Sequence, residues 1–263
     1  MDSERPPATR YHFDGRDDWR NHATFTFDLA MVCRGLHAIR HVVPEHARSI
    51  ASMNILSRAL LTGDGLPVYI NRQRDLPDRW STSPGPYQLK AAAALLSVLD
   101  HPALWKTYEV WKSRAVTAMK PEEVHGALNA VEGLVQFGLF GRSEALPNAA
   151  HCFEVRFSDS APWTRDPRSD VIAQAIRLGC VLRSFGFLPD HRWQDWLSDL
   201  RLLLEDFIDG SGRVSFRPSG HRPLHYNAWS AIFTYQALYY YERFIQGIEK
   251  NSVQLQSSAS WYT

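Results

Sequence analysis

The polar positions between residues 122 and 138 fall on one line along an otherwise apolar segment. In EEVHGALNAVEGLVQFG, the polar residues after the first turn are His125, Asn129, Glu132 and Gln136, spaced by four, three and four. Residues at these spacings share one face of an α-helix. Because a surface helix carries a broad polar face, this narrow line predicts a helix that is packed on most sides. Its polar line should face a cavity or a buried polar network.

Two later segments repeat this pattern of a polar line on an apolar helix. Residues 168–179 align Asp170, Gln174 and Arg177, and residues 225–238 align Asn227, Ser230 and Thr234. Polar lines on several helices favour a shared central cavity. The alternative is that each line only joins its helix to a neighbouring helix through a buried hydrogen-bond network.

The periodicity of apolar residues predicts eight helices joined by segments rich in Pro and Gly. The helices are expected at about 24–41, 47–61, 89–99, 103–117, 121–138, 169–185, 192–207 and 227–246. Short strands are expected in the connections, at about 66–70, 152–157 and 213–216. The charged, Pro-containing residues 1–20 predict an extended N-terminal arm, and the polar residues 250–263 predict a flexible tail. The fold class is therefore all-α, with a single domain over residues 21–249 and short β-hairpin-like segments in its loops.

One order of segments recurs along the chain. A Pro- or Gly-rich segment with Trp or Arg leads into a helix with polar first turns and an Ala-rich apolar body, at residues 79–96, 163–178 and 213–238. The helices between these are more amphipathic. This order predicts an alternation of buried and half-exposed helices in a repeat-built α fold.

These repeats resemble the α/α-toroid superfamily, which includes terpene-cyclase and prenyltransferase-like repeat domains, six-hairpin glycosidases and sugar 2-epimerases. The matching segments are FDLAMVCRGL (27–36), RWSTSPGPYQLKAAAALL (79–96), HGALNAVEGLVQFG (125–138), RSDVIAQAIRLG (168–179) and DGSGRVSF with HYNAWSAIFTYQAL (209–238). The resemblance covers about residues 24–246. It implies an α/α toroid, a barrel of inner and outer helices with its site at one open end.

Two motifs found in members of the superfamily are missing from this chain. Class II terpene cyclases carry an aspartate-rich acid motif, which Asp14, Asp17 and Asp18 do not reproduce. Protein prenyltransferases and lanthionine-type cyclases bind zinc through Cys and His, and no such local pairing occurs here. We therefore expect no metal and no cofactor.

Composition and charge argue against several classes of function. The 263 residues carry a formal net charge of +1, which indicates no nucleic-acid surface. No apolar run approaches the roughly twenty residues of a membrane span, and the N-terminus has no signal-peptide core. The three cysteines, Cys33, Cys152 and Cys180, form no CxxC pair, which fits a reducing compartment. The expected protein is soluble and cytoplasmic, with no membrane partner.

The titratable residues on the polar lines suit general acid/base chemistry. The expected catalytic residues are Glu132, His125 and Asp170; His125 and Glu132 lie two helical turns apart, about 10 Å by helix rise, and bracket a small substrate. Glu132 is the strongest of the three, because an unpaired buried carboxylate is costly. The residues expected to bind substrate are Asp28, Arg79, Trp80, Lys90, Asn129, Trp163, Gln174, Arg177, His225, Tyr226 and Asn227.

Each of these residues also has a simpler structural interpretation. His125 serves as a packed or network histidine, and Lys90 is simply solvated at the start of its helix. Asp170 caps its helix together with Ser169. Trp80 and Trp163 pack against neighbouring helices instead of lining an entrance.

No nucleophile elbow, phosphate loop, dinucleotide fingerprint or metal-binding helix motif is present. The expected function is a cofactor-free acid/base step on a small polar metabolite, of cyclase or isomerase type, in specialised metabolism. One alternative is a glycoside hydrolase or sugar-epimerase-like enzyme, in which Glu132 and Asp170 would be the two carboxylates. Another is a non-catalytic module for a ligand, carrier or partner protein, with the Arg-rich loops 72–79 and 213–222 as its docking face.

Overall fold

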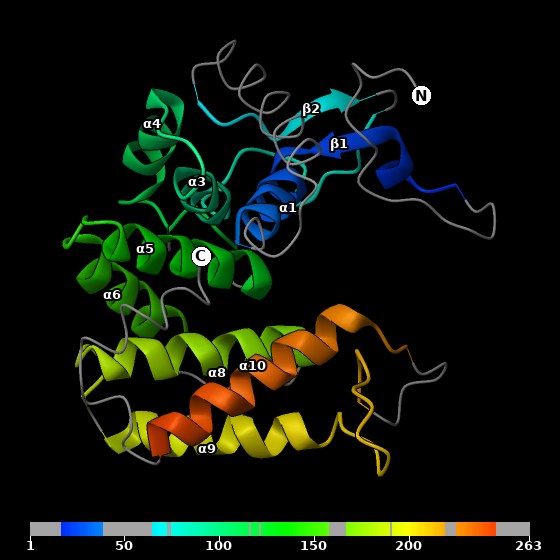
Figure 1. The fold of residues 1–263 in the computed structure, drawn as a ribbon, viewed down its shortest axis with the longest axis vertical. Helices are drawn as coiled ribbons and strands as arrows, with labels where there is room; N and C mark the ends of the chain where they lie inside the picture. Colours follow the sequence, from blue (N-terminus) through cyan, green and yellow to red (C-terminus); the bar gives the residue numbers. More distant parts are fainter. Residues whose placement is uncertain are drawn as a thin grey trace. The chain divides into compact units, whose positions relative to one another are not determined.

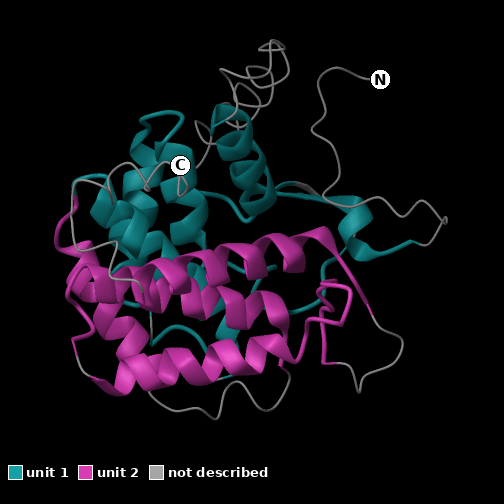
Figure 2. Ribbon diagram, turned by 60° about the horizontal axis from the view of Figure 1, so that its bottom comes forward, with its two compact units in different colours: residues 1–141, 259–263 teal, residues 142–258 magenta. Residues whose placement is uncertain are grey.

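The computed structural model describes residues 17–38, 65–72, 75–115, 117–120, 122–157, 167–189, 191–218 and 225–245. Within these ranges, eight α-helices and a two-stranded sheet form two compact units (Figure 1). Unit 1 is Met1–Gly141 with Ala259–Thr263, and unit 2 is Arg142–Ser258 (Figure 2). The described chain is mainly helical, which confirms the all-α class. The helix expected at 47–61 lies outside the described residues, and the single domain over 21–249 stays a prediction.

The two-stranded sheet belongs to unit 1, and its strands come before and after the first helix in the chain. Strand β1 (Ala23–Phe25) pairs antiparallel with β2 (Tyr69–Arg72), and α1 (Thr26–Ala38) follows β1 directly. A short 3-10 helix, η1 (Trp19–His22), leads into the sheet, and its Trp19 ring packs edge-on against Phe25 at 5.6 Å.

This N-terminal part of unit 1 differs from the sequence prediction at three points. Residues 24 and 25, expected as the start of the first helix, are strand because their backbone pairs with β2. Trp19 and Arg20, expected in the extended arm, belong to η1, which begins after Asp18, whose carboxylate accepts a hydrogen bond from the Arg20 backbone N–H at 3.0 Å. The strand expected at 66–70 starts later, at Tyr69.

The interior of unit 1 is the crossing of α3 (Gln88–Leu96) with α5 (Val124–Leu139). The run Ala91–Ala94 is fully buried, and small residues of this kind let helices approach closely. The closest point is Gly133, where a Cβ atom would lie only 2.4 Å from the backbone nitrogen of Lys90. Helix α5 begins after the two glutamates expected in its first turn, with Glu123 at its N-cap.

Helix α4 (Pro102–Trp111) covers α3 with one face only. His101 is its N-cap, since its Nδ1 accepts a hydrogen bond from Ala103 N at 3.2 Å, and Pro102 occupies the first turn, where a missing N–H costs nothing. Its buried residues are Ala103, Leu104, Thr107 and Tyr108. Their helical spacing leaves the opposite face to solvent.

Unit 2 contains α6 (Ala145–Phe157), α8 (Ser169–Ser184), α9 (His191–Glu205) and α10 (Ala228–Ile245) (Figure 2). The strand expected at 152–157 is wrong, because these residues form the end of α6. The alternation of Phe153, Val155 and Phe157 indicated a strand, but Val155 is 57% exposed. The buried residues of this helix, including Ala149, Phe153 and Phe157, follow a spacing of four instead.

Helix α8 is the core of unit 2, since every residue from Ser169 to Leu182 is buried. It packs against α6, α9 and α10. Gly179 marks the contact with α9, because a Cβ there would lie 2.8 Å from a methyl carbon of Leu197. The predicted alternation is found from α3 to α9: α3, α5 and α8 are buried along most of their length, whereas α4, α6 and α9 bury one face each. It is wrong for α10, which was expected to be a buried helix and instead buries one face only.

The connection between α9 and α10 is organised by Asp209. Its carboxylate accepts hydrogen bonds from the hydroxyl and backbone N–H of Ser211 and from the backbone and guanidinium of Arg213. The Ser211 hydroxyl contributes most to holding the pKa of Asp209 below its ordinary value, against a smaller opposing effect of partial burial. The strand expected at 213–216 is reduced to isolated bridges, Ile208 to Val214 and Ser215 to Tyr226. In the described part of the chain, no helix is both long and apolar enough to cross a bilayer.

Candidate functional site

The centre of the site in unit 1 is a buried ion pair between α3 and α5. Lys90 Nζ lies 3.0 Å from Glu132 Oε2, and the two side chains are only 5% and 3% exposed. The alternative that Lys90 is simply solvated is therefore wrong. Burial of two charges costs several kcal/mol per ion before their attraction is counted, so such a pair requires close geometry and further hydrogen bonds.

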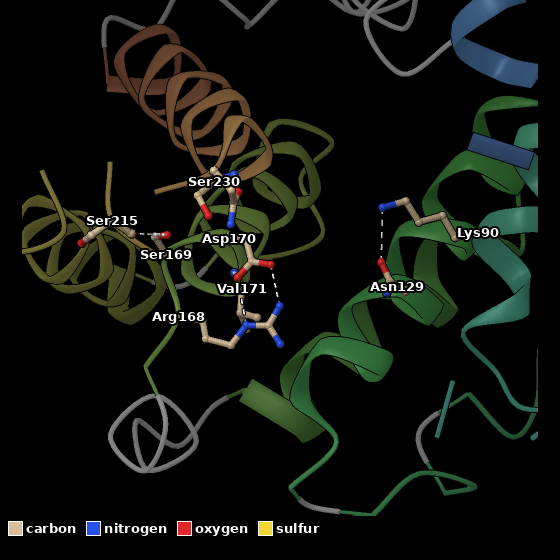
Figure 3. A network of polar contacts seen from close by, with 9 residues as sticks. Lys90, Asn129, Arg168, Ser169, Asp170, Val171, Ser215 and Ser230 are labelled. Atoms are coloured by element: carbon tan, nitrogen blue, oxygen red, sulfur yellow. Dashed lines mark hydrogen bonds and ion pairs between the residues drawn. The ribbon is translucent and has the colours of Figure 1, made fainter. Parts of the chain in front are cut away.

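Amide side chains of the same polar line surround this pair. Lys90 Nζ donates a hydrogen bond to Asn129 Oδ1 at 3.2 Å (Figure 3), and Gln136 Nε2 donates a long one to Glu132 Oε1 at 3.5 Å. All four side chains are buried. The polar line predicted on α5 therefore faces α3, and the positive charge that pairs with its Glu132 belongs to Lys90 of α3.

A series of aromatic rings connects the buried pair with the surface. His125, half-buried at the start of α5, lies edge-on to Trp80 at 5.6 Å, and Trp80 lies edge-on to Tyr87 at 5.1 Å. Tyr87 contacts Phe27 at 6.0 Å, and Lys90 Nζ lies 5.9 Å from the centre of the Phe27 ring. Since Trp80, His125 and Phe27 are each partly exposed, the rings form a partly solvent-exposed wall that extends to the buried ammonium.

Tyr87 and Asp28 add a further constraint to this wall. The Tyr87 hydroxyl contacts the backbone oxygens of Ser81 and Ser83 at 3.2 Å each, which fixes the loop that precedes α3. Burial, followed by the negative charge of Asp28, raises the pKa of Tyr87 well above its ordinary value. Tyr87 is therefore a neutral hydrogen-bond donor at physiological pH. Asp28 sits in the first turn of α1, as predicted.

The polar line of α8 is bonded within unit 2. Asp170 accepts hydrogen bonds from Arg168 Nε at 3.1 Å and Nη2 at 2.6 Å (Figure 3), and it also accepts one from the backbone N–H of Val171. Arg177 donates from Nη1 to Gln236 Oε1 on α10 at 2.6 Å. Ser169, the expected capping partner of Asp170, instead donates to the backbone oxygen of Ser215. The α8 line therefore serves helix-to-helix and helix-to-loop contacts.

Glu132 and His125 belong to unit 1 and Asp170 to unit 2, so the three expected catalytic residues are divided between the units. Glu132 and His125 both lie on α5, where His125 contacts Trp80 and Glu132 contacts Lys90. Of the residues expected to bind substrate, Trp80, Lys90 and Asn129 gather with them. Gln174 is buried on α8, in unit 2.

Four of the remaining candidates have surroundings of their own. Arg79 is exposed in the loop before α3, and His225 packs its ring against Phe216 at 5.7 Å. Tyr226 is exposed and donates its hydroxyl to Asp209 Oδ2 at 3.3 Å. Asn227 caps α10, since its Oδ1 accepts a hydrogen bond from Ser230 N at 2.7 Å. Trp163 lies outside the described residues.

Sequence reasoning missed two ring residues of the site and one ion-pair partner. Phe27 was counted only as an apolar residue of the first helix, and Tyr87 was overlooked in the Pro- and Gly-rich segment before α3. The available signal was their position, since Phe27 directly precedes Asp28 and Tyr87 lies three residues before Lys90. Arg168, two residues before Asp170, was equally visible as a neighbouring opposite charge.

The cysteines offer little nucleophilic chemistry in the native fold. All three are buried thiols. Burial raises the pKa of Cys33 and of Cys152 to about 11 each. Within the described ranges, no three His, Cys, Asp or Glu side chains come together as a metal site would require.

We expect the native protein to resist thiol alkylation. At about pH 8, a thiol with a pKa near 11 is ionised in about one molecule in a thousand, and the thiolate is the reactive form. Iodoacetamide should therefore label Cys33 and Cys152 only after denaturation, as measured by intact-mass spectrometry. Fast labelling of either residue in the native state would contradict the burial described above.

The chain matches no protein-family model, no curated protein and no solved structure.

Proposed function

We propose that unit 1 binds a small polar metabolite and transforms it by cofactor-free general acid/base chemistry, in a cyclase- or isomerase-type step. The observation that carries this proposal is the Lys90–Glu132 pair, 3.0 Å apart and almost fully buried, at the end of a partly exposed aromatic wall. Ionisable groups held in buried, charge-coupled environments are concentrated at functional sites.

The proposed chemistry follows from the protons that Glu132 and Lys90 can accept and donate. The Glu132 carboxylate accepts a proton from the substrate, while the Lys90 ammonium stabilises the negative charge that develops and returns a proton to another substrate atom. The amide of Asn129 orients Lys90 through its hydrogen bond. Trp80 and Phe27 would pack against the apolar part of the substrate, and His125 is the titratable group at the exposed end of the wall.

The proposal rests on residues of unit 1. A glycoside hydrolase would need two carboxylates that flank one bond, whereas Glu132 is paired with Lys90 and Asp170 with Arg168. The α/α-toroid arrangement is part of the same proposal. It is supported by the alternation of buried helices with helices that bury one face.

A second candidate function is the binding of a protein partner by unit 2. Its support is the outer face of α10, where Trp229, Ile232 and Tyr235 are exposed at a spacing of three. Exposed aromatic residues on one helix face are enriched at protein interfaces. This function would not involve Glu132, so substitutions on α5 and on α10 separate the two candidates.

A ligand screen by thermal unfolding tests the proposed function. Wild type is compared with Lys90→Met/Glu132→Gln, which removes both charges while keeping the length of both side chains. Sugars, amino-acid derivatives and prenyl diphosphates are added as separate classes. A ligand that binds only the native state at about 100 times its Kd should raise the midpoint by roughly 5–10 °C. We expect one class to do so for wild type only, and to be converted to product as seen by mass spectrometry.

Two controls make the result decisive. Glu109→Gln/Lys112→Met removes an exposed ion pair of α4 and its C-terminus, and should respond to ligand as wild type does. His125→Phe keeps a ring beside Trp80 and should retain binding but lower the conversion rate. If no class shifts wild type while the charge-free variant is fully stable, or if both respond equally, the pair has no role in ligand chemistry.

A further inference from the structure

The seam between α8 and α10 contains polar groups that the acid/base site does not use. Helix α10 packs on α8 with its buried face, which consists of Ser230, Phe233, Thr234, Ala237 and Tyr240. Three of these five residues carry a hydroxyl, and two of them, Ser230 and Thr234, lie one helical turn apart. The polar line of α8 meets the same face, since its guanidinium at Arg177 reaches Gln236 and lies 5.3 Å from the Phe233 ring.

The hydroxyls of Ser230 and Thr234 are the unusual feature of this seam. The two residues are 0% and 2% exposed, and neither Ser230 Oγ nor Thr234 Oγ1 has a hydrogen-bond partner among the described residues. Helical Ser and Thr commonly donate to the carbonyl four residues earlier, and neither does so here. A buried hydroxyl without a partner destabilises the fold by its full desolvation free energy. A native protein therefore normally supplies a hydrogen-bond partner for it.

The charged side chains of α8 nearest this seam have contacts within the protein. Asp170 is held by the guanidinium of Arg168, and Arg177 donates to Gln236. The two hydroxyls themselves are neutral, and each can donate one hydrogen bond and accept others. Their complement is another neutral hydroxyl oxygen, which also donates and accepts.

The spacing indicates that one oxygen can serve both hydroxyls. Side chains four residues apart on a helix have Cβ atoms about 5–6 Å apart. Two O–H···O bonds of about 2.8 Å placed end to end span about 5.6 Å. We propose that the α8–α10 seam is an internal binding site in which one hydroxyl oxygen, from water or from a polyol, bridges Ser230 and Thr234.

Removal of each hydroxyl, alone and together, tests this site. Thr234→Val and Ser230→Ala keep the packing closely similar, and unfolding in urea is followed by tryptophan fluorescence. We expect each variant to raise the unfolding equilibrium constant roughly two- to tenfold, because a hydrogen bond to the bridging oxygen is lost. The double variant should raise it by much less than the product of the two, because the first substitution already disrupts the bridge.

The control is Thr107→Val in unit 1. Thr107 Oγ1 is buried with protein partners, since it donates to Ala103 O at 2.9 Å and accepts from Leu66 N at 3.1 Å. Thr107→Val should raise the unfolding equilibrium constant by about the same factor as Thr234→Val. Variants at 230 and 234 that are as stable as wild type or more stable would overturn the proposal, since they would show that the hydroxyls have no ligand. If the double variant raises the unfolding equilibrium constant by the full product of the two single effects, the two hydroxyls act independently and the single bridging oxygen is ruled out.

The same variants distinguish the two sources of the oxygen. Wild type is melted with millimolar sugar alcohols and monosaccharides, and a bound polyol raises the midpoint in a saturable way that Thr234→Val abolishes. No shift with any polyol, together with the coupled losses in urea, identifies the bridging oxygen as water. Either result supports the site.

Discussion

Gly133→Ala is expected to destabilise unit 1 by about 3 kcal/mol, at the upper end of the usual cost of overpacking a core. The new Cβ would lie 2.4 Å from the carbonyl carbon of Leu89 and from the backbone nitrogen of Lys90. Because these are backbone atoms, no rotamer change relieves the contact, and α3 and α5 must move apart. The free energy of unfolding in urea, measured by circular dichroism, checks the prediction.

The matched control is Gly35→Ala in α1. A Cβ there meets nothing within 4 Å. Alanine has the higher helix propensity, so this variant should be more stable by roughly 0.5–1 kcal/mol. If Gly133→Ala were tolerated as well as Gly35→Ala, the close crossing of α3 and α5 would not exist in solution.

Loss of one member of the Lys90–Glu132 pair is expected to cost even more, about 3–5 kcal/mol, because the remaining charge stays buried without its partner. This applies to Lys90→Met, which leaves the Glu132 carboxylate, and to Glu132→Gln, which leaves the ammonium. The side chains are 5% and 3% exposed, so solvent cannot replace the missing partner without opening the crossing. Chemical unfolding of both variants measures the loss.

The double variant Lys90→Met/Glu132→Gln should recover most of this stability, because it leaves no unpaired charge. We expect a coupling energy of about 3 kcal/mol in the double-mutant cycle. Recovery would be incomplete, since Asn129 Oδ1 loses the hydrogen bond that Lys90 donates. Losses that simply add would show that the two charges do not interact, and would remove the main support for the proposed site.

These two predictions concern one feature of the molecule. Gly133 allows α5 to approach the backbone of Lys90, and Glu132, the preceding residue, receives the ammonium of that same lysine. The close crossing therefore positions the ion pair. A variant that separates the helices should weaken ligand binding even where every proposed catalytic group is still present.

The sequence by itself determined that α3, α5 and α8 are buried and which of their residues are polar, although it was wrong in expecting α10 to be buried as well. The spacing of Asn129, Glu132 and Gln136 predicted a packed helix with one polar line, and α5 has this form. The same reasoning identified the lines on α8 and α10, because a helical period of 3.6 residues is visible locally. It was wrong for 152–157, where a short alternation of apolar residues could not be told from a helix end.

Only the tertiary structure decided what each polar line faces. A line of polar residues on one helix carries no information about which residue of another helix comes opposite. Lys90 and Glu132 are separated by 42 positions in the chain, and their contact depends on a crossing set by Gly133 and the Ala91–Ala94 run. For the same reason, Arg177 and Gln236 could be paired only once α8 and α10 were seen packed together. Local periodicity establishes a face, whereas the partner of that face is a long-range property of helix packing.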